Sequence, residues 1–179
     1  ICVFSIKKIM KTKKNLVLVG MMGSGKSTIG NIISKKLDFG FIDTDSEIEK
    51  YEEISIKKIF EIEGEEYFRK LEEKIILKSI NLDNQVISLG GGGFLKLNLR
   101  KKIQIKCISF WLDWKDDTII KRIFNNDKRP LATHLSKIDL KDMIAKRYKH
   151  YKQADHRIFC ENLNKKEIAD KIIKKYETQ

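Results

Sequence analysis

Short apolar runs alternate with helical patterns along the chain. Residues 16–19, all leucine or valine, have the composition of a buried parallel strand, and four later apolar runs are also predicted to form strands. The predicted strands are 16–19, 39–42, 86–89, 105–112 and 157–160. Parallel strands need crossover connections, and right-handed crossovers place helices on both faces of the sheet. The order therefore predicts an α/β fold, a three-layer α/β/α sandwich around a five-stranded parallel sheet.

Two helices are well marked by their spacing. After the first strand, four apolar residues fall on one helical face: Ile29, Ile32, Ile33 and Leu37. Near the other end of the chain, Asn164 and Glu167 form a capping pair for a final helix. The buried stripe of that helix is predicted to consist of Ile168, Ile172 and Ile173.

Length and composition indicate one domain. The chain has 179 residues, of which 41% are hydrophobic, and it contains one proline and no glycine- and serine-rich linker. We expect residues 1–12 to be an N-terminal extension, a candidate for disorder, and residues 13–179 to form the domain. Met10 is a plausible start of the natural protein, in which case residues 1–9 are an upstream extension.

Composition also bears on the cellular compartment. No apolar run approaches the roughly 20 residues needed to cross a bilayer, and lysines follow the first apolar patch, the reverse of a secretory signal. The three cysteines, Cys2, Cys107 and Cys160, form no CxxC motif, which favours reduced thiols. We expect a cytoplasmic protein that does not act at a membrane.

The chain is basic. Lysine and arginine number 37 against 25 acidic residues, which gives a formal net charge of +12 and raises the question of nucleic-acid binding. However, the basic residues are spread over the predicted outer faces of several helices, with glutamates between them and no aromatic platform for single strands. We therefore favour a solvated surface and expect no nucleic-acid partner.

Residues 20–27 match the phosphate-binding motif GxxxxGK[ST]. The motif lies between a predicted strand and a predicted helix, so a chance glycine turn is the weaker interpretation. Glycines let backbone N–H groups converge on phosphate oxygens, and the helix N-terminus adds the positive end of its dipole. Lys26 can supply a cation for the β- and γ-phosphates, and Ser27 can ligate Mg²⁺. The sequence predicts a site for a magnesium–nucleoside triphosphate.

The second and third predicted strands also end in residues suited to a ligand site. Asp43 and Asp45 follow the second strand, and the glycine run 90–93 follows the third. Ligands of parallel α/β sheets bind beyond the carboxyl ends of the strands, so one aspartate is expected to face the phosphate loop and the other an acceptor pocket. Two simpler interpretations stay open. Asp45 could cap a helix over 46–52, and the glycines could form a plain flexible loop.

Three arginines are candidates for anion binding. Arg69 and Arg147 lie on predicted helices, where Arg69 could merely pair with a glutamate four residues to either side and Arg147 could be a surface charge. Arg129 precedes Pro130, which disfavours the α conformation, so it is predicted to lie in an extended or turn segment between two helices. A mobile arginine there would suit the charge on a transferring phosphoryl group.

In order and spacing, these motifs resemble those of the shikimate kinase family. The resemblance runs from about Lys13 to Lys175. The phosphate loop alone is shared by many ATPases, but the combination is specific. It consists of the loop 20–27, Asp43-x-Asp45, Phe68-Arg69-x-x-Glu72, Gly90-Gly91-Gly92, Arg129-Pro130-Leu131 and Arg147.

The resemblance implies a P-loop fold of the nucleoside-monophosphate-kinase type and a defined reaction. That reaction is ATP-dependent phosphorylation of the 3-hydroxyl of shikimate, which yields shikimate 3-phosphate and ADP on the route to chorismate and the aromatic amino acids. Shikimate and ATP are the implied ligands, Mg²⁺ is the implied cofactor, and a lid is implied at about 123–138. We expect a monomer.

The resemblance also implies roles for single positions. Ser27 matches a Mg²⁺ ligand, Asp43 the carboxylate that supports the metal through water, and Asp45 the candidate base that binds shikimate hydroxyls. Arg122 matches the residue that stacks on adenine, and Arg129 the lid arginine. The implied catalytic residues are Lys26, Asp45 and Arg129. The implied ATP-binding residues are Gly23, Ser24, Gly25, Lys26, Ser27, Thr28, Arg122 and Arg129. The implied shikimate-binding residues are Asp45, Arg69, Gly91, Gly92 and Arg147, with the two arginines on the carboxylate.

Three departures from the family pattern and three alternatives remain. Adenine contacts near Asn162 to Lys165 are only weakly matched. A fourth glycine, Gly93, follows the usual three, and Asn31 stands where a basic residue is common, which leaves the nucleotide preference open. The closest alternative is another small-molecule kinase of this architecture, for gluconate or a nucleotide, although Arg69 and Arg147 favour a carboxylated polyol. A non-catalytic nucleotide switch would lack an acceptor carboxylate such as Asp45, and a nucleic-acid-binding ATPase would carry a clustered basic face.

Overall fold

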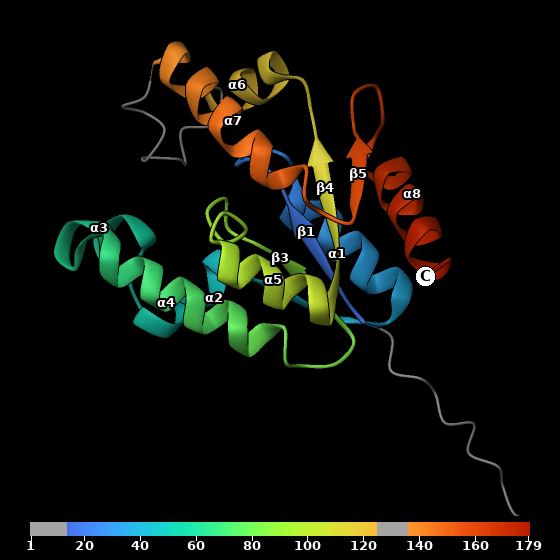
Figure 1. The fold of residues 1–179 in the computed structure, drawn as a ribbon, viewed down its shortest axis with the longest axis horizontal. Helices are drawn as coiled ribbons and strands as arrows, with labels where there is room; N and C mark the ends of the chain where they lie inside the picture. The colour runs from blue at the N-terminus through green and yellow to red at the C-terminus, as the bar shows by residue number, and fades with distance from the viewer. Residues whose placement is uncertain (1–13, 125–135) are drawn as a thin grey trace, which may run out of the picture.

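A computed structural model describes residues 14–124 and 136–179 (Figure 1). At its centre, five parallel strands pair in the order β2-β3-β1-β4-β5. The strands are β1 (Asn15–Val19), β2 (Gly40–Asp43), β3 (Gln85–Ser88), β4 (Cys107–Asp113) and β5 (His156–Phe159). The carboxyl end of β1 therefore lies between those of β3 and β4, in the middle of the edge where such sheets bind ligands.

Helices cover both faces of the sheet. Leu16 and Leu18 of β1 face a hydrophobic cluster formed with α1 and α8, whereas Val17 and Val19 face a second cluster formed with α5, α6 and α7. Figure 1 shows α8 beside α1, with which it is in contact. These helices are α1 (Lys26–Leu37), α5 (Leu97–Lys106), α6 (Asp116–Phe124), α7 (Lys137–Tyr151) and α8 (Lys165–Glu177). The predicted α/β/α sandwich is confirmed.

Three further helices form a side unit next to β2. They are α2 (Thr44–Glu52), α3 (Ile56–Ile62) and α4 (Gly64–Ser79), and Figure 1 shows them grouped at one side of the sheet. Their own hydrophobic cluster contains Ile48, Ile59, Phe68, Leu71 and Ile75. Since α2 starts directly after β2, the unit is tied to the carboxyl edge of the sheet, where α4 can add side chains to a site.

Most element boundaries follow the sequence pattern, with one clear exception. The predicted strand 105–112 starts too early, because α5 continues to Lys106 and β4 begins at Cys107. Ile105 is 71% exposed, while Ile103 is fully buried in the same helix. The final helix is capped as predicted: Asn164 and Glu167 form a capping box, and Ile168 and Ile172 are buried.

Several expectations concern the termini, the lid and the thiols. The extension 1–12 lies outside the described residues, as does most of the predicted lid, whose described ends belong to α6 and α7. Cys107 and Cys160 are buried and unbridged, and burial raises the pKa of each thiol to about 12. Within residues 14–124 and 136–179, no helix has both the length and the apolar character to cross a membrane.

Candidate active site

The loop 20–27 joins β1 to α1 through backbone conformations that favour glycine. The φ angle is +81° at Gly23 and +90° at Gly25. Gly25 is the residue from which α1 starts, and it has no side chain with which to cap the helix. No side chain caps the start of α1, and the positive end of the helix dipole there favours an anion.

Lys26 and Ser27 open α1 and are both fixed by polar contacts. Lys26 is buried, and its Nζ donates to the carbonyl oxygens of Gly20 at 2.9 Å and Met21 at 3.0 Å. Ser27 Oγ donates to Asp43 Oδ2 at 2.5 Å. These contacts place an ammonium group within the loop and set a hydroxyl beside a carboxylate at the end of β2.

Asp43 also caps α2. Its Oδ1 accepts hydrogen bonds from the backbone N–H groups of Asp45 at 3.2 Å and Ser46 at 3.3 Å. The interpretation of Asp45 as the cap of a helix over 46–52 is therefore wrong, because the helix begins at Thr44 and Asp43 fills that role. The carboxylate of Asp45, within the first turn, is left for another purpose.

Asp45 carries the clearest electrostatic signal of the site. Burial, followed by the charge of Asp43, raises the pKa of Asp45 from 3.8 to about 6, although Lys26 lowers it. Glu72, which is only 3% exposed, is a further negative neighbour. A carboxyl group with a pKa just below neutrality is suited to proton transfer.

The glycine run after β3 lies against three of the candidate site side chains. None of the four glycines has a positive φ, so left-handed geometry does not explain them. Close approach does: a methyl group on Gly90 would overlap Asp45 Oδ1, one on Gly91 would lie 2.8 Å from Arg147 Nη1, and one on Gly92 would overlap Arg69 Nη1. Larger residues at these three positions would displace the polar side chains of Asp45, Arg147 and Arg69, so close approach accounts for the glycines.

A threonine ties the aspartate turn to the glycine run. Thr44, between Asp43 and Asp45, is fully buried and its Oγ1 donates to the carbonyl oxygen of Ser88 at 3.2 Å. The same Oγ1 accepts from the backbone N–H of Gly90 at 2.9 Å. The relative position of Asp45 and the glycine run is therefore set by two hydrogen bonds from one side chain.

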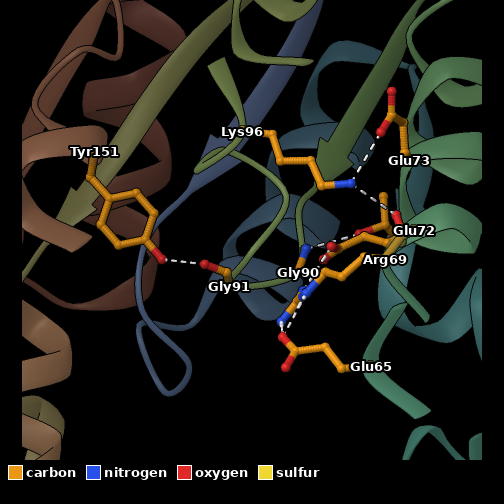
Figure 2. A network of polar contacts seen from close by, with 9 residues as sticks. Glu65, Arg69, Glu72, Glu73, Gly90, Gly91, Lys96 and Tyr151 are labelled. Atoms are coloured by element: carbon orange, nitrogen blue, oxygen red, sulfur yellow. Dashed lines mark hydrogen bonds and ion pairs between the residues drawn. The ribbon is translucent and has the colours of Figure 1, made fainter. Parts of the chain in front are cut away.

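Arg69 lies on α4 between two glutamates (Figure 2). Its Nη1 donates to Glu72 Oε2 at 2.8 Å, and its Nε and Nη2 both donate to Glu65 Oε1 at 3.3 Å. The glutamate four residues later, Glu73, pairs with Lys96 instead. Arg69 therefore pairs with glutamates of its own helix and also lies against Gly92 of the glycine run.

Arg147 reaches the same place from α7, on the opposite side of the glycine run. One turn later, Tyr151 OH donates to the carbonyl oxygen of Gly91 at 2.6 Å, as Figure 2 shows. Tyr151 is 2% exposed, and burial raises the pKa of its hydroxyl to about 12, so it stays a donor. The helix that carries Arg147 is thus bonded to the backbone that it faces.

These groups line one cleft of about 620 Å³. The predicted site residues that line it are Gly23, Gly25, Lys26, Ser27, Thr28, Asp43, Asp45, Arg69, Gly91, Gly92 and Arg147. Ser24 is fully buried and lies outside this lining, while Arg129 lies outside the described residues. A phosphate loop, a carboxylate of raised pKa and two guanidinium groups thus face one space, which suits phosphoryl transfer to an anionic acceptor.

Comparison with known proteins identifies the family. The family model described as shikimate kinase matches residues 22–177. The shikimate kinase of Persephonella marina is 42% identical over 161 residues, which cover 89% of this chain and 97% of that protein. The chain belongs to the shikimate kinase family. The shikimate kinase of Caldicellulosiruptor bescii is also similar, at 40% identity over 89% of this chain and 94% of the relative.

Solved structures of shikimate kinases share the fold. The enzyme of Acinetobacter baumannii, in complex with shikimate, has a TM-score of 0.86 at 28% identity and covers 92% of this chain and 93% of its own. A gluconokinase of Sinorhizobium meliloti has a TM-score of 0.59 at 14% identity over 93% of both chains, which is a likeness of fold alone. The expectation of an ATP-dependent shikimate kinase is confirmed, and the gluconokinase is a relative in fold alone.

Arg122 lies beside the phosphate loop but does not line the cleft. Its guanidinium carbon is 3.7 Å from the ring centroid of Trp114, and its Nη1 donates to the carbonyl oxygen of Gly23 at 3.4 Å. No sequence motif marks Trp114, Thr44 or Tyr151 as part of the site. Their signal is weak in a single sequence, because each acts through a neighbour that is distant in the chain.

Proposed function

We propose that the cleft transfers the γ-phosphoryl group of ATP to the 3-hydroxyl of shikimate by the residues named above. The observation that carries this assignment is the position of Asp45, beside Gly90 in the cleft that the phosphate loop and the two arginines also line. A shikimate hydroxyl must lose a proton as it attacks phosphorus, and its ring carboxylate must be held at the far end. The cleft offers a carboxylate for the first need and two guanidinium groups for the second.

In the proposed step, the hydroxyl oxygen attacks the γ-phosphorus in line as the bond to the bridging oxygen of ADP breaks. The proton of the hydroxyl passes to Asp45, which is largely ionised at pH 7 because its pKa is about 6. Lys26, already within the loop, offsets negative charge on the β- and γ-phosphates. Little covalent chemistry is asked of the protein, so alignment supplies much of the rate.

Ser27 and Asp43 are the proposed ligands toward Mg²⁺, with Asp43 acting through water. Their contact of 2.5 Å places hydroxyl and carboxylate oxygens together, the donor type that this cation takes. In the described part of the chain, no group of three or more His, Cys, Asp or Glu side chains could hold a metal. A magnesium ion keeps waters and phosphate oxygens as its other ligands, so two protein oxygens suffice for it. When bound, the ion would neutralise phosphate charge.

Arg69 and Arg147 are proposed to hold the shikimate carboxylate, with Gly91 and Gly92 against the ring. The two guanidinium groups come from separate helices and lie against adjacent glycines, Arg147 at Gly91 and Arg69 at Gly92. Each can donate two hydrogen bonds to a carboxylate, so together they fix both its position and its direction. Glu72 holds Arg69 in place for this contact.

On the ATP side, the proposed contacts beyond Lys26 and Ser27 are those of Gly23, Ser24, Gly25, Thr28 and Arg122. Arg129 is proposed as the cation that a lid at about 123–138 brings to the transferring group, on the sequence alone, since it lies outside the described residues. We also propose a cytoplasmic monomer without nucleic-acid or membrane partners. The helical lysine pairs noted in the sequence, such as Lys35 with Lys36 and Lys165 with Lys166, are exposed and scattered, which supports a solvated surface.

A coupled ADP-release assay tests the function. With ATP and Mg²⁺, shikimate should start ADP release and give shikimate 3-phosphate, while gluconate and nucleoside monophosphates should not. Asp45→Asn measured in the same assay tests the site, since it keeps the size of the side chain and removes the base. ADP release with gluconate and not with shikimate would overturn the acceptor assignment, and full activity of Asp45→Asn would overturn the role of Asp45.

A further inference from the structure

Trp114 lies directly after β4, beside the phosphate loop. The guanidinium carbon of Arg122 is 3.7 Å from the centroid of its ring, a distance typical of direct stacking of a cation on an aromatic face. The indole Nε1–H donates to the carbonyl oxygen of Ser24 at 3.0 Å, and Arg122 donates to that of Gly23. The stacked pair is therefore bonded to two adjacent peptides of the loop.

Arg122 is the more exposed member of the stacked pair. Arg122 is exposed, whereas Trp114 is partly buried and packs against the hydrophobic clusters of both sheet faces. One turn earlier on α6, Thr118 Oγ1 donates to Glu161 Oε1 at 2.7 Å, which ties the segment after β5 to this helix. A flat group that lies beyond the phosphate loop would thus meet the outer guanidinium face, with the segment after β5 close by.

We propose that Trp114 is a positioning residue for the nucleotide base. Its ring supports Arg122 from behind, so that indole, guanidinium and adenine form one stack and the base is held in register with the phosphates in the loop. This rests on the proposed contact of Arg122 with adenine and adds the residue that prepares it. An arginine already stacked on a fixed indole loses less rotamer freedom when the base arrives, which strengthens binding of the base without adding a contact to it.

Binding of ADP compared with pyrophosphate, each with Mg²⁺, tests the proposal by calorimetry without shikimate. Both ligands offer two phosphates to the loop, but only ADP has a base. Trp114→Leu removes the supporting face and should weaken ADP about fivefold, with pyrophosphate within about twofold of wild type. Trp114→Phe keeps an aromatic face and loses the indole N–H, so ADP affinity should stay within about twofold. Equal weakening of both ligands in Trp114→Leu would mean that Trp114 only supports the loop, and would overturn the proposal.

The other tryptophan provides a matched control. Trp111 is 4% exposed, and its ring centroid lies 5.1 Å from the guanidinium carbon of Arg157. The chain has two tryptophans, so Trp111→Phe leaves Trp114 as the sole indole fluorophore. In that variant ADP should bind as in wild type and change the tryptophan emission, and pyrophosphate should change it much less. Unchanged emission at saturating ADP would overturn the proposal, even if Trp114→Leu does not fold.

Arg122→Ala separates this inference from the assignment on which it rests. If Arg122→Ala weakens ADP and Trp114→Leu does not, the support role is overturned while the adenine contact stands. If Arg122→Ala leaves ADP affinity unchanged, the adenine contact itself is overturned, and the support role with it. Neither result depends on whether shikimate is the acceptor, which the ADP-release assay tests separately.

Discussion

The carboxylate of Asp45 occupies the space that a side chain at residue 90 would need. A methyl group on Gly90 would overlap Asp45 Oδ1, and the backbone N–H of Gly90 is bonded to Thr44, the residue before Asp45. The glycine and the aspartate are therefore one structural unit. The carboxylate of the proposed base can occupy its position only because residue 90 has no side chain.

Gly90→Ala should accordingly lower kcat/KM for shikimate by at least about tenfold, because a displacement of about 1 Å at a reacting group can cost up to about a hundredfold. Gly93→Ala is the matched control. Its methyl group would meet Ile76 Cδ1 at 2.6 Å, the end of a flexible side chain, so it should lower the melting temperature and leave kcat/KM within about threefold. Steady-state kinetics and thermal unfolding of both variants check this. Equal activity losses in the two alanine variants would mean that general disturbance of the run, rather than Asp45, is responsible.

The pKa of Asp45 sets the acidic limb of the activity profile. Because burial raises that pKa to about 6, kcat/KM for shikimate should fall as the pH drops through about 6 and approach a tenfold loss per pH unit below it. An ordinary aspartate would move that limb to about pH 4. A profile flat from pH 7.5 to 4.5 would remove Asp45 as the base, provided that the protein stays folded and ATP affinity is measured across the same range.

The same pKa has the opposite consequence for stability. The folded protein binds the proton of Asp45 more tightly than the unfolded chain does, so this group's contribution to stability is largest below about pH 4 and falls as the pH rises to about 6. Asp45→Asn should therefore raise the free energy of unfolding at pH 7, by up to about 3 kcal/mol, and lower kcat by at least about a hundredfold. At pH 4 the stability gain should vanish. Denaturant titrations at both pH values check the sign, and a gain that is equal at pH 4 and 7 would contradict it.

The sequence predicts which residues form this site far better than it predicts their burial and pKa values. Asp45 was identified by its place after a strand, but its pKa depends on burial and on Asp43, and it could not be obtained from spacing. Glu72 stands in a recognised motif, yet nothing in the pattern shows that a glutamate on an otherwise charged helix is 3% exposed. The predicted start of a strand at Ile105 is wrong for a related reason. The spacing of Ile103 and Ile105 also fits a strand, but both residues lie in the last turn of α5. Local order follows from the sequence, but burial depends on the packing of distant elements.

The acceptor arginines give the last prediction. If Arg69 and Arg147 share the carboxylate of shikimate, Arg147→Ala should weaken shikimate binding at least about tenfold, with ATP affinity within a few-fold of wild type. Arg69→Ala should weaken shikimate similarly and also destabilise the fold, because it leaves the buried carboxylate of Glu72 without its partner at 2.8 Å. The double variant Arg69→Ala with Glu72→Gln should recover part of that stability and none of the affinity.

Loss of both arginines should weaken shikimate binding by less than the sum of the two single losses in binding free energy, since both contact one carboxylate. Calorimetric titrations with shikimate and with a non-hydrolysable ATP analogue measure each term. Additive losses in binding free energy would mean that the two arginines contact separate groups. Unchanged shikimate affinity in both folded single variants would mean that Arg69 only pairs with glutamates of its helix and that Arg147 is only a surface charge.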